Sequence, residues 1–515
     1  MTAGSSKSAE VVATRPTPGT PRPYEFPAVE RFRLANGLRV IVANLPGRPL
    51  VSASLILRNG AVDEPAAHAG ATVLAARALS EGTDQFDAIA LVEAGERLGA
   101  SLHADAGWDA MTVSVDVPAP RLEPALELVA EMALHPTFPE SEVERLRDER
   151  LNDLLQAKAD PRRRADEAFA STIYEAASPY HRPAGGTRDT VSELTPGRLR
   201  TAYERGLDPA RATLIVGGDL GGLDVEAIAN RLLGSWGPAA GATVTGKIVD
   251  AGAVRERFVR VLHRPGAVQT EIRIGHVGAP RRIDDFHALS VMGAILGGLF
   301  NSRLNMKLRE EKGYTYGAGA GFDLRRGAGP FGARAAVNTE VTVPAVADFL
   351  VELDRIREGP VTDAELRGAR DFLVGVFPLR FETPGPVVGA LSGLVIHELP
   401  EDELARYRGA IEAVTADDVL EAARTRLRPD RSAIVLVGDA DAFGPALEAA
   451  GFGPVTIERD EGPTEEGREP GVAAAIGPVD VGPEGPTEGA DEPTVEGSDD
   501  GTADAHAPAG GDNAS

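Results

Sequence analysis

Apolar and polar residues follow two periods along this chain. Segments such as "LRVIVANL" (38–45) and "MTVSVDV" (111–117) are typical of strands with a buried face. The stretch "RLEPALELVAEMAL" (121–134) repeats apolar residues every three or four positions and predicts an amphipathic helix. Because strands and helices do not alternate strictly, we expect an α+β fold in which helices cover one face of a sheet.

The same pattern occurs twice. "LILRNGAVDEPAAHAG" (55–70) matches "IRIGHVGAPRRIDDFHAL" (272–289), and "ADAGWD" (104–109) matches "AGAGFD" (318–323). Two longer pairs follow in the same order, and the first of them joins "FPESEVERLRDERL" to "PVTDAELRGARDFL". The second joins "LTPGRLRTAYERGLDPARATLIVGGD" to "VTADDVLEAARTRLRPDRSAIVLVGD". Four matches in one order, at an offset of 214 to 220 residues, indicate an internal duplication.

The duplication predicts two similar modules, at residues 25–250 and 251–455. A disordered segment is expected at 1–24 and an acidic disordered tail at 456–515. From Glu458 onward the chain has 16 acidic residues and two arginines, a net charge of −14 out of −25 for all 515 residues. Such a tail has too little apolar surface to fold, and solubility is its simplest role.

Composition narrows the function classes. No cysteine is present, which excludes disulfides and thiolate chemistry. No stripe of basic residues indicates a nucleic-acid-binding surface. No stretch of the sequence approaches the ~18 apolar residues that a membrane-spanning helix needs. The start has one lysine and no apolar run of leader length, so we expect a cytoplasmic protein.

One predicted helix, "AGATVLAARALSEGT" (69–83), has few polar residues and is closed by a Glu-Gly-Thr turn. With "NGLRVIVANLPGRPLVSASLILRNGAVDEP", "PAGGTRDTVSELT", "LIVGGD" and "LGGLFNSRLNMKLREEKGYTYGAGAGF", it makes the chain resemble the pitrilysin/insulinase family of zinc metallopeptidases. The resemblance covers about residues 28 to 455 and is strongest with the short, two-module members that include mitochondrial processing peptidases. It implies two tandem modules, each a mainly antiparallel sheet covered by helices.

The family's active site is an inverted zinc motif, His-x-x-Glu-His, on the helix before the Gly-Thr turn. Its histidines at i and i+4 hold the metal, and its glutamate acts as general base. Here the three positions are Val73, Ala76 and Arg77, none of which is a zinc ligand or a base. The distal glutamate falls on Asn152, or on Asp153 with a one-residue shift. His68, His103, His135 and His181 are too scattered to replace the motif, so no metal is expected in this chain.

The second module keeps another family feature, an arginine and a tyrosine seven residues apart. In two-module members this pair reaches the zinc site of the other module and stabilises the oxyanion. The resemblance places the pair on Arg309 and Tyr316, with Tyr314 as a fallback. A structural role, with Arg309 paired to a glutamate and Tyr316 in a core, is the competing interpretation. Candidate peptide contacts precede the pair at Gly297, Gly298, Ser302 and Arg303, although a tight packing turn explains these residues equally well.

These features favour a non-catalytic subunit of a heterodimeric zinc endopeptidase. The expected partner is a zinc-bearing peptidase of the same family, and the expected substrate is a peptide or unfolded segment. The alternative is a structural or peptide-binding protein of this fold with no peptidase role. An independent peptidase with other metal ligands is the least favoured interpretation. The partner's identity, the substrate's sequence and length, the tail's role and homodimerisation stay open.

Overall fold

The computed structural model describes residues 23–243 and 248–459. The first module is built on a six-stranded sheet in the order β1-β2-β6-β3-β5-β4. All neighbours pair antiparallel except β2 and β6, which are parallel. The strands are β1 (Val29–Arg33), β2 (Arg39–Asn44), β3 (Leu50–Leu57), β4 (Ser101–Ala106), β5 (Met111–Pro118) and β6 (Thr213–Gly218).

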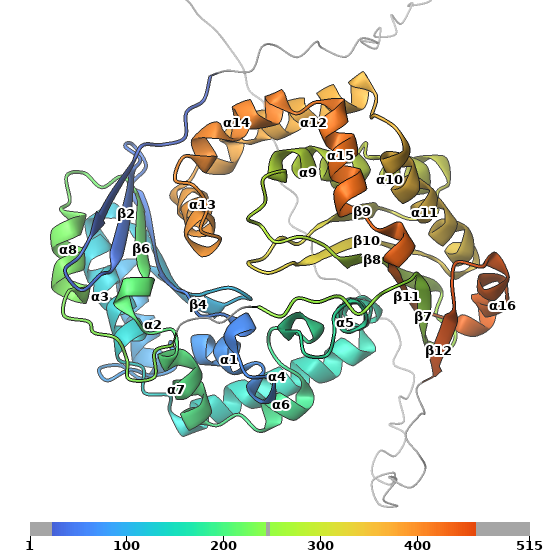
Figure 1. The fold of residues 1–515 in the computed structure, drawn as a ribbon. Helices are drawn as coiled ribbons and strands as arrows, with labels where there is room; N and C mark the ends of the chain where they lie inside the picture. Colours follow the sequence, from blue (N-terminus) through green and yellow to red (C-terminus); the bar gives the residue numbers. More distant parts are fainter. Residues whose placement is uncertain (1–22, 244–247, 460–515) are drawn as a thin grey trace, which may run out of the picture. The chain divides into compact units, whose positions relative to one another are not determined.

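A second six-stranded sheet repeats this arrangement in the order β12-β7-β11-β8-β10-β9 (Figure 1). Its strands are β7 (Phe258–His263), β8 (Gln269–Val277), β9 (Ala318–Phe322), β10 (Pro330–Asn338), β11 (Ala433–Gly438) and β12 (Val455–Arg459). Each inner strand has its counterpart at the same place in the first sheet. The predicted fold class, with two tandem α+β modules and mainly antiparallel sheets, is therefore confirmed.

The two sheets differ at one edge. In the first, β1 comes from the start of the module and runs antiparallel to β2. In the second, β12 comes from the end of the module and runs parallel to β7. The predicted start of the tail at 456 is therefore wrong by a few residues, because Val455 and Ile457 pack against the second core. The predicted segments 1–24 and 456–515 otherwise lie outside the described residues, apart from Pro23 and Tyr24.

Most helices of the first module contribute apolar residues to the core on one side of its sheet. In α3, Leu122, Leu126 and Val129 are buried at the helical spacing that the pattern predicted. The helices are α1 (Ala71–Ala78), α2 (Ala88–Leu98), α3 (Leu122–Leu134), α4 (Glu140–Ala159), α5 (Pro161–Ile173), α6 (Arg188–Ser192), α7 (Pro196–Glu204) and α8 (Val225–Leu233). The predicted boundary at residue 250 falls between α8 and β7.

The second module has a comparable set, with two short π-helical turns inside it. The elements are α9 (Phe286–Gly293), η6 (Ala294–Gly298), α10 (Arg303–Asn305), η7 (Met306–Glu311), α11 (Thr342–Glu358), α12 (Asp363–Val376), α13 (Pro384–Ile396), α14 (Glu403–Ala413), α15 (Ala416–Arg426) and α16 (Ala440–Ala450). In the part of the chain described here, no helix combines the length and the apolar character that crossing a bilayer requires.

Each module covers the free face of the other module's sheet with one helix. Helix α13 packs on β3 and β6, where Leu391 joins a buried cluster that includes Ile56 and Ile215. Helix α5 packs on β8 and β11, where Phe169 joins a cluster that includes Val435. Each sheet thus has apolar residues on both faces, and one face is covered by a helix far away in the sequence.

The loop between β9 and β10 adds a polar contact between the modules. Arg326 donates to both carboxylate oxygens of Asp63, at 3.0 and 3.1 Å, and to Asp109 at 3.3 Å. All three side chains are at most 10% exposed. Beside them, the Arg325 guanidinium lies over the rings of Trp108 and Tyr180, at 4.6 and 4.7 Å from the centroids.

Candidate functional site

The helix at the position of the family's catalytic helix is α1, which spans Ala71–Ala78 and is shorter than predicted. It starts at Gly70, whose φ of 93° lies in the left-handed region that favours glycine. Gly82 and Thr83 form the expected turn beyond it, bridging to Asp87 and Pro136. The element and its boundary turn are where the pattern predicted them.

The three motif positions on α1 do not fit a zinc ion. Val73 is partly buried and packs against the first core, and Ala76 is completely buried in that core. Arg77 is exposed and its Nη2 lies 3.3 Å from a carboxylate oxygen of Glu149 on α4. Zinc in proteins is bound by imidazole, thiolate or carboxylate groups, and none of these side chains carries one. No step of a reaction can therefore be assigned to a metal at these residues.

Helix α4, which packs against α1, carries the predicted position of the distal ligand. Asn152 is exposed there, and it lines a cavity of about 410 Å³ together with Lys158, Glu167 and Thr187. Asp153 is committed to arginines, since Arg163 Nη1 lies 2.7 Å from its carboxylate and Arg150 also bonds to it. The Arg163 hydrogen bond, above all, lowers the pKa of Asp153.

Ion pairs join α1 to α4 in the region where the resemblance would place a metal. Glu149 contacts Arg77 on α1 and also accepts a hydrogen bond from Arg145 at 2.6 Å. Arg145 in turn reaches Glu81, just beyond α1, at 2.5 Å, and Glu142 at 2.8 Å. The hydrogen bond with Glu142, followed by that with Glu81, raises the pKa of Arg145. This network connects the two helices through side chains alone.

Sequence reasoning missed one buried carboxylate at the start of α1. Glu64 is 8% exposed and accepts hydrogen bonds from the backbone N–H of Gly70, at 2.8 Å, and of Thr72. Burial raises the pKa of Glu64, and these hydrogen bonds oppose the rise. The available signal was two adjacent acidic residues, Asp63 and Glu64, shortly before a helix start, where negative charge is favoured. Glu64 fixes the beginning of α1.

The predicted Arg–Tyr pair lies in the second module, on and after η7. The Arg309 guanidinium lies 4.5 Å from the ring centroid of Phe300, and its Nε is 3.5 Å from Glu310. Tyr316 follows on the loop before β9 and is 94% exposed. The fallback Tyr314 packs against the second core instead. The competing interpretation is therefore wrong in placing Tyr316 in a core, but its pairing of Arg309 with a glutamate is present, with Glu310 as the partner.

The candidate peptide contacts before this pair are largely engaged within the module. A side chain at Gly297 would place its Cβ 2.2 Å from the Ala320 backbone nitrogen, so this glycine permits close packing of η6 on β9. Gly298 ends η6, and Ser302 is buried at the start of α10. Arg303 donates to both carboxylate oxygens of Glu365 on α12, at 2.7 and 3.2 Å. A contact of these residues with peptide stays a prediction.

The four histidines considered as substitute ligands lie on separate elements: His68, His103, His135 and His181. Within the described residues, one group of three potential metal ligands occurs, formed by His263, Asp439 and Asp441 in the second module. Its atoms have other partners. His263 Nδ1 accepts from the Ala440 N–H, and Asp441 accepts from Arg459. This group caps α16 and has no connection with the motif on α1.

Comparison with known proteins agrees with this fold. The model described as Insulinase (Peptidase family M16) matches residues 39–184, and the model described as Peptidase M16 inactive domain matches residues 193–373. An uncharacterized zinc protease of Mycobacterium tuberculosis is 26% identical over 79% of this chain and 93% of its own length. A "Non-peptidase homolog YmxG" of Helicobacter pylori is 24% identical over 61% of this chain and 72% of its own length.

Two solved structures share the architecture. A peptidase M16 inactive domain from Pseudomonas fluorescens superposes with a TM-score of 0.73 at 25% identity, covering 80% of this chain and 98% of its own. A protease from Helicobacter pylori superposes with a TM-score of 0.75 at 18% identity, covering 81% of this chain and all of its own. Two family models in tandem, with these relatives, match both modules, and the chain is a two-module member of peptidase family M16.

Proposed function

We propose that this chain is a non-catalytic subunit of a zinc endopeptidase and that it donates Arg309 and Tyr316 to the active site of a zinc-bearing partner. The observation that carries the proposal is a contrast between the modules. The first has an alkyl side chain and an arginine where ligands belong, whereas the second presents Arg309 and a 94% exposed Tyr316 outside its core.

The environment of Arg309 suits a group that acts on an external partner. Stacking on Phe300, itself 66% exposed, fixes the plane of the guanidinium, while the 3.5 Å contact with Glu310 leaves other N–H donors available. A guanidinium and a phenol hydroxyl are the donors that stabilise developing negative charge in acyl transfer. This chain would bind and orient the peptide and its oxyanion, and the partner would supply zinc and the general base.

The names of similar proteins support a non-catalytic role without deciding it. One relative is named a non-peptidase homolog, and one superposed structure is named an inactive domain. Other relatives are named zinc proteases. The residues at the motif positions of this chain support a role like that of the first group.

The test combines the purified chain with an M16 protein that has an intact His-x-x-Glu-His motif, using an internally quenched peptide as substrate. We expect cleavage by the mixture and neither stoichiometric zinc nor cleavage with this chain alone. Arg309→Ala should lower the kcat of the complex by at least about 10-fold, because an oxyanion donor is lost. Tyr316→Phe should also lower kcat, with a smaller effect on KM.

Arg334→Ala is the matched control, since Arg334 is also an exposed arginine of the second module. Size-exclusion chromatography should show that each variant still forms the complex. Full activity of an intact Arg309→Ala complex would exclude the proposed role. A stable complex without activity under any pairing would instead support a structural or peptide-binding protein.

A further inference from the structure

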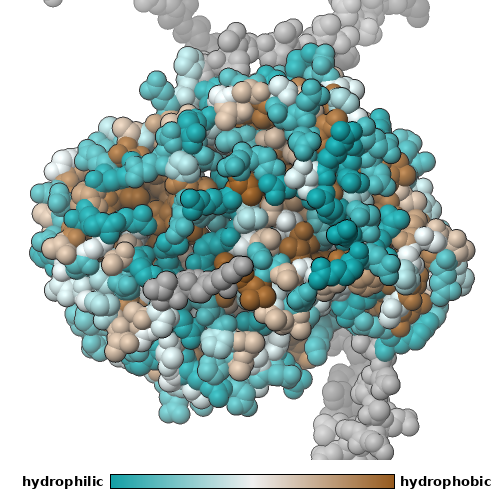
Figure 2. All heavy atoms as spheres, viewed as in Figure 1, coloured by the Kyte–Doolittle hydropathy of each residue, from teal (hydrophilic) through white to brown (hydrophobic). Residues whose placement is uncertain are grey.

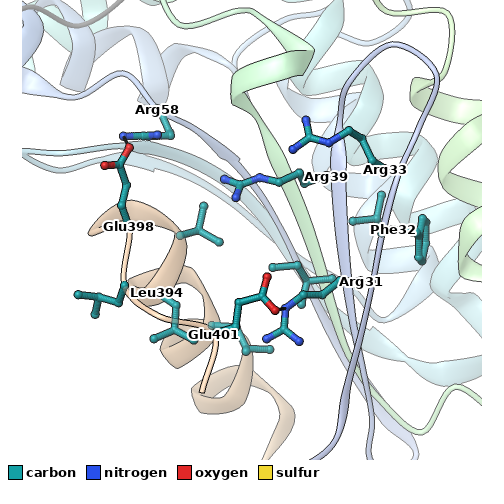
Figure 3. A pocket seen from close by; sticks show the side chains of 13 residues that line it. Arg31, Phe32, Arg33, Arg39, Arg58, Leu394, Glu398 and Glu401 are labelled. Carbon is teal, nitrogen blue, oxygen red and sulfur yellow. Dashed lines mark ion pairs between the residues drawn. The ribbon is translucent and has the colours of Figure 1, made fainter. Parts of the chain in front are cut away.

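A cavity of about 540 Å³ lies between the β1–β2 hairpin and the end of α13, on different elements from Arg309 and Tyr316 (Figure 3). Its walls are of two kinds. The apolar wall includes Ile41 of β2 and Leu391, Leu394 and Val395 of α13. The polar wall consists of four arginines and two glutamates: Arg31, Arg33, Arg39, Arg58, Glu398 and Glu401. Cations therefore exceed anions by two around a partly apolar cavity.

The strand register gathers three of these arginines, Arg31, Arg33 and Arg39, on one face of the sheet. Arg33 lies directly opposite Arg39 in the antiparallel pair, and Arg31 lies opposite Ile41. Opposed residues project to the same face, and this face carries Ile41 under α13. Like charges directly opposite each other destabilise a sheet. The repulsion is relieved when an anion lies between the guanidinium groups.

Three of the four arginines already have partners. Arg58 lies 2.6 Å from Glu398, Arg31 lies 3.5 Å from Glu401, and Arg33 donates to the Gly37 carbonyl at 2.7 Å. The Arg39 guanidinium makes no hydrogen bond or ion pair with any residue in 23–243 or 248–459. Figure 3 shows it extending from β2 toward α13.

Two further observations show that Arg39 and Arg58 are shielded from much of the bulk water. Arg39 is only partly exposed, and burial, together with Arg33 and Arg58, lowers its pKa against the smaller, opposing effects of Glu398 and Glu401. The Nε of Arg58 is buried and has no partner among the described residues. Figure 2 shows mostly hydrophilic side chains on the visible surface, with apolar side chains gathered in smaller patches.

We propose that this cavity binds a carboxylate attached to a short apolar group, with Arg39 as its principal donor. A carboxylate matches the planar guanidinium fork, and the apolar part would lie against Ile41, Leu391 and Leu394. The volume is in the range of sites for small ligands. Two sources have this chemistry: the C-terminal residue of a peptide, and a free medium-chain carboxylic acid.

Titration calorimetry on the full chain tests the proposal with four probes. These are acetyl-leucyl-leucine with a free C-terminus, the same dipeptide as its C-terminal amide, octanoate, and inorganic phosphate. We expect saturable binding of at least one carboxylate and weaker binding as salt screens the arginines. Binding of the dipeptide alone would identify a chain end as the ligand, and binding of octanoate would identify a free acid.

Arg39→Gln should weaken carboxylate binding by at least about 10-fold, as expected for a lost charged hydrogen bond. Glu398→Gln should strengthen it several-fold, because it removes a competing anion and releases Arg58. Arg334→Gln on β10 should leave it unchanged. Equal affinity of the Arg39 variant, equal binding of the amide, phosphate binding as tight as that of the organic acids, or no saturable binding would each overturn the proposal.

Discussion

In the first module, side chains at the motif positions take part in packing and ion pairs. Ala76 is completely buried in the core, and Arg77 belongs to an ion-pair network with α4. Glu64, a few residues earlier, is used to start α1 by accepting backbone N–H groups. These residues give α1 a defined beginning and contacts with the core and with α4. These contacts hold the helix in its position in the fold.

We expect Glu64→Ala to lower the free energy of unfolding by about 1–3 kcal/mol, because two buried backbone N–H groups lose their acceptor. Urea denaturation measures the effect. Glu93→Ala is the control: Glu93 is an exposed acid in an (i, i+4) pair with Arg97, and its loss should cost less than about 0.5 kcal/mol. Equal values for the two variants would show that Glu64 does not stabilise α1.

At the scale of elements, the sequence pattern predicted many of the helices and strands, but it did not predict where all of them pack. The strands, α1 with its Gly-Thr turn and the duplication are visible in sequence because they depend on local periodicity and turn residues. The exchange of α5 and α13 between the modules is not visible in the sequence, because the apolar face of a helix does not specify which sheet it covers. The Arg303–Glu365 pair between α10 and α12 was also missed, because 62 residues separate its partners. Likewise, no local signal distinguished β12 from the acidic tail.

The Arg303–Glu365 pair predicts a pH dependence. Burial alone would raise the pKa of Glu365, but the hydrogen bonds from Arg303 and Thr362 outweigh it and lower the pKa from 4.5 to about 2. A carboxyl group whose pKa is lower in the folded than in the unfolded state stabilises the fold at pH values above its unfolded pKa. This contribution is lost as the pH falls from 4.5 toward 2.

Glu365→Gln should therefore be about 1 kcal/mol less stable than the wild type at neutral pH, a modest figure because the pair is partly exposed. The difference should shrink as the pH is lowered below 4.5. Urea denaturation at several pH values measures it. Glu448→Gln is the control, because Glu448 is an exposed acidic residue on α16, and its effect on stability should not change with pH in this way. A constant difference at every pH would contradict the assignment.

Across the whole described chain, the modules are held together by two apolar clusters and by polar contacts, which include Arg273 with Asp166 and Arg326 with two aspartates. Arg326 binds Asp63 and Asp109 where all three groups are shielded from water. A buried carboxylate that loses its cation is costly, because its desolvation is no longer compensated. This contact is therefore sensitive to the removal of a single side chain.

Arg326→Ala should lower the free energy of unfolding by about 3–5 kcal/mol, which calorimetry would report as a lower Tm. Arg231→Ala is a close control, since Arg231 also contacts two carboxylates, those of Glu123 and Glu127, but all three are about half exposed. Its loss should cost about 1 kcal/mol or less. Similar losses for the two variants would mean that burial of the Arg326 contact has no special effect.

The reciprocal placement of α5 and α13 has a consequence for how such a chain arises. A single module on its own would expose the apolar face of its sheet to water. Two separate copies could cover these faces only by exchanging helices in a dimer. When both modules belong to one chain, this exchange is intramolecular. Covering the two sheets then no longer depends on the concentration of the protein. Tandem duplication within one chain thus ensures that each sheet meets the helix that covers it.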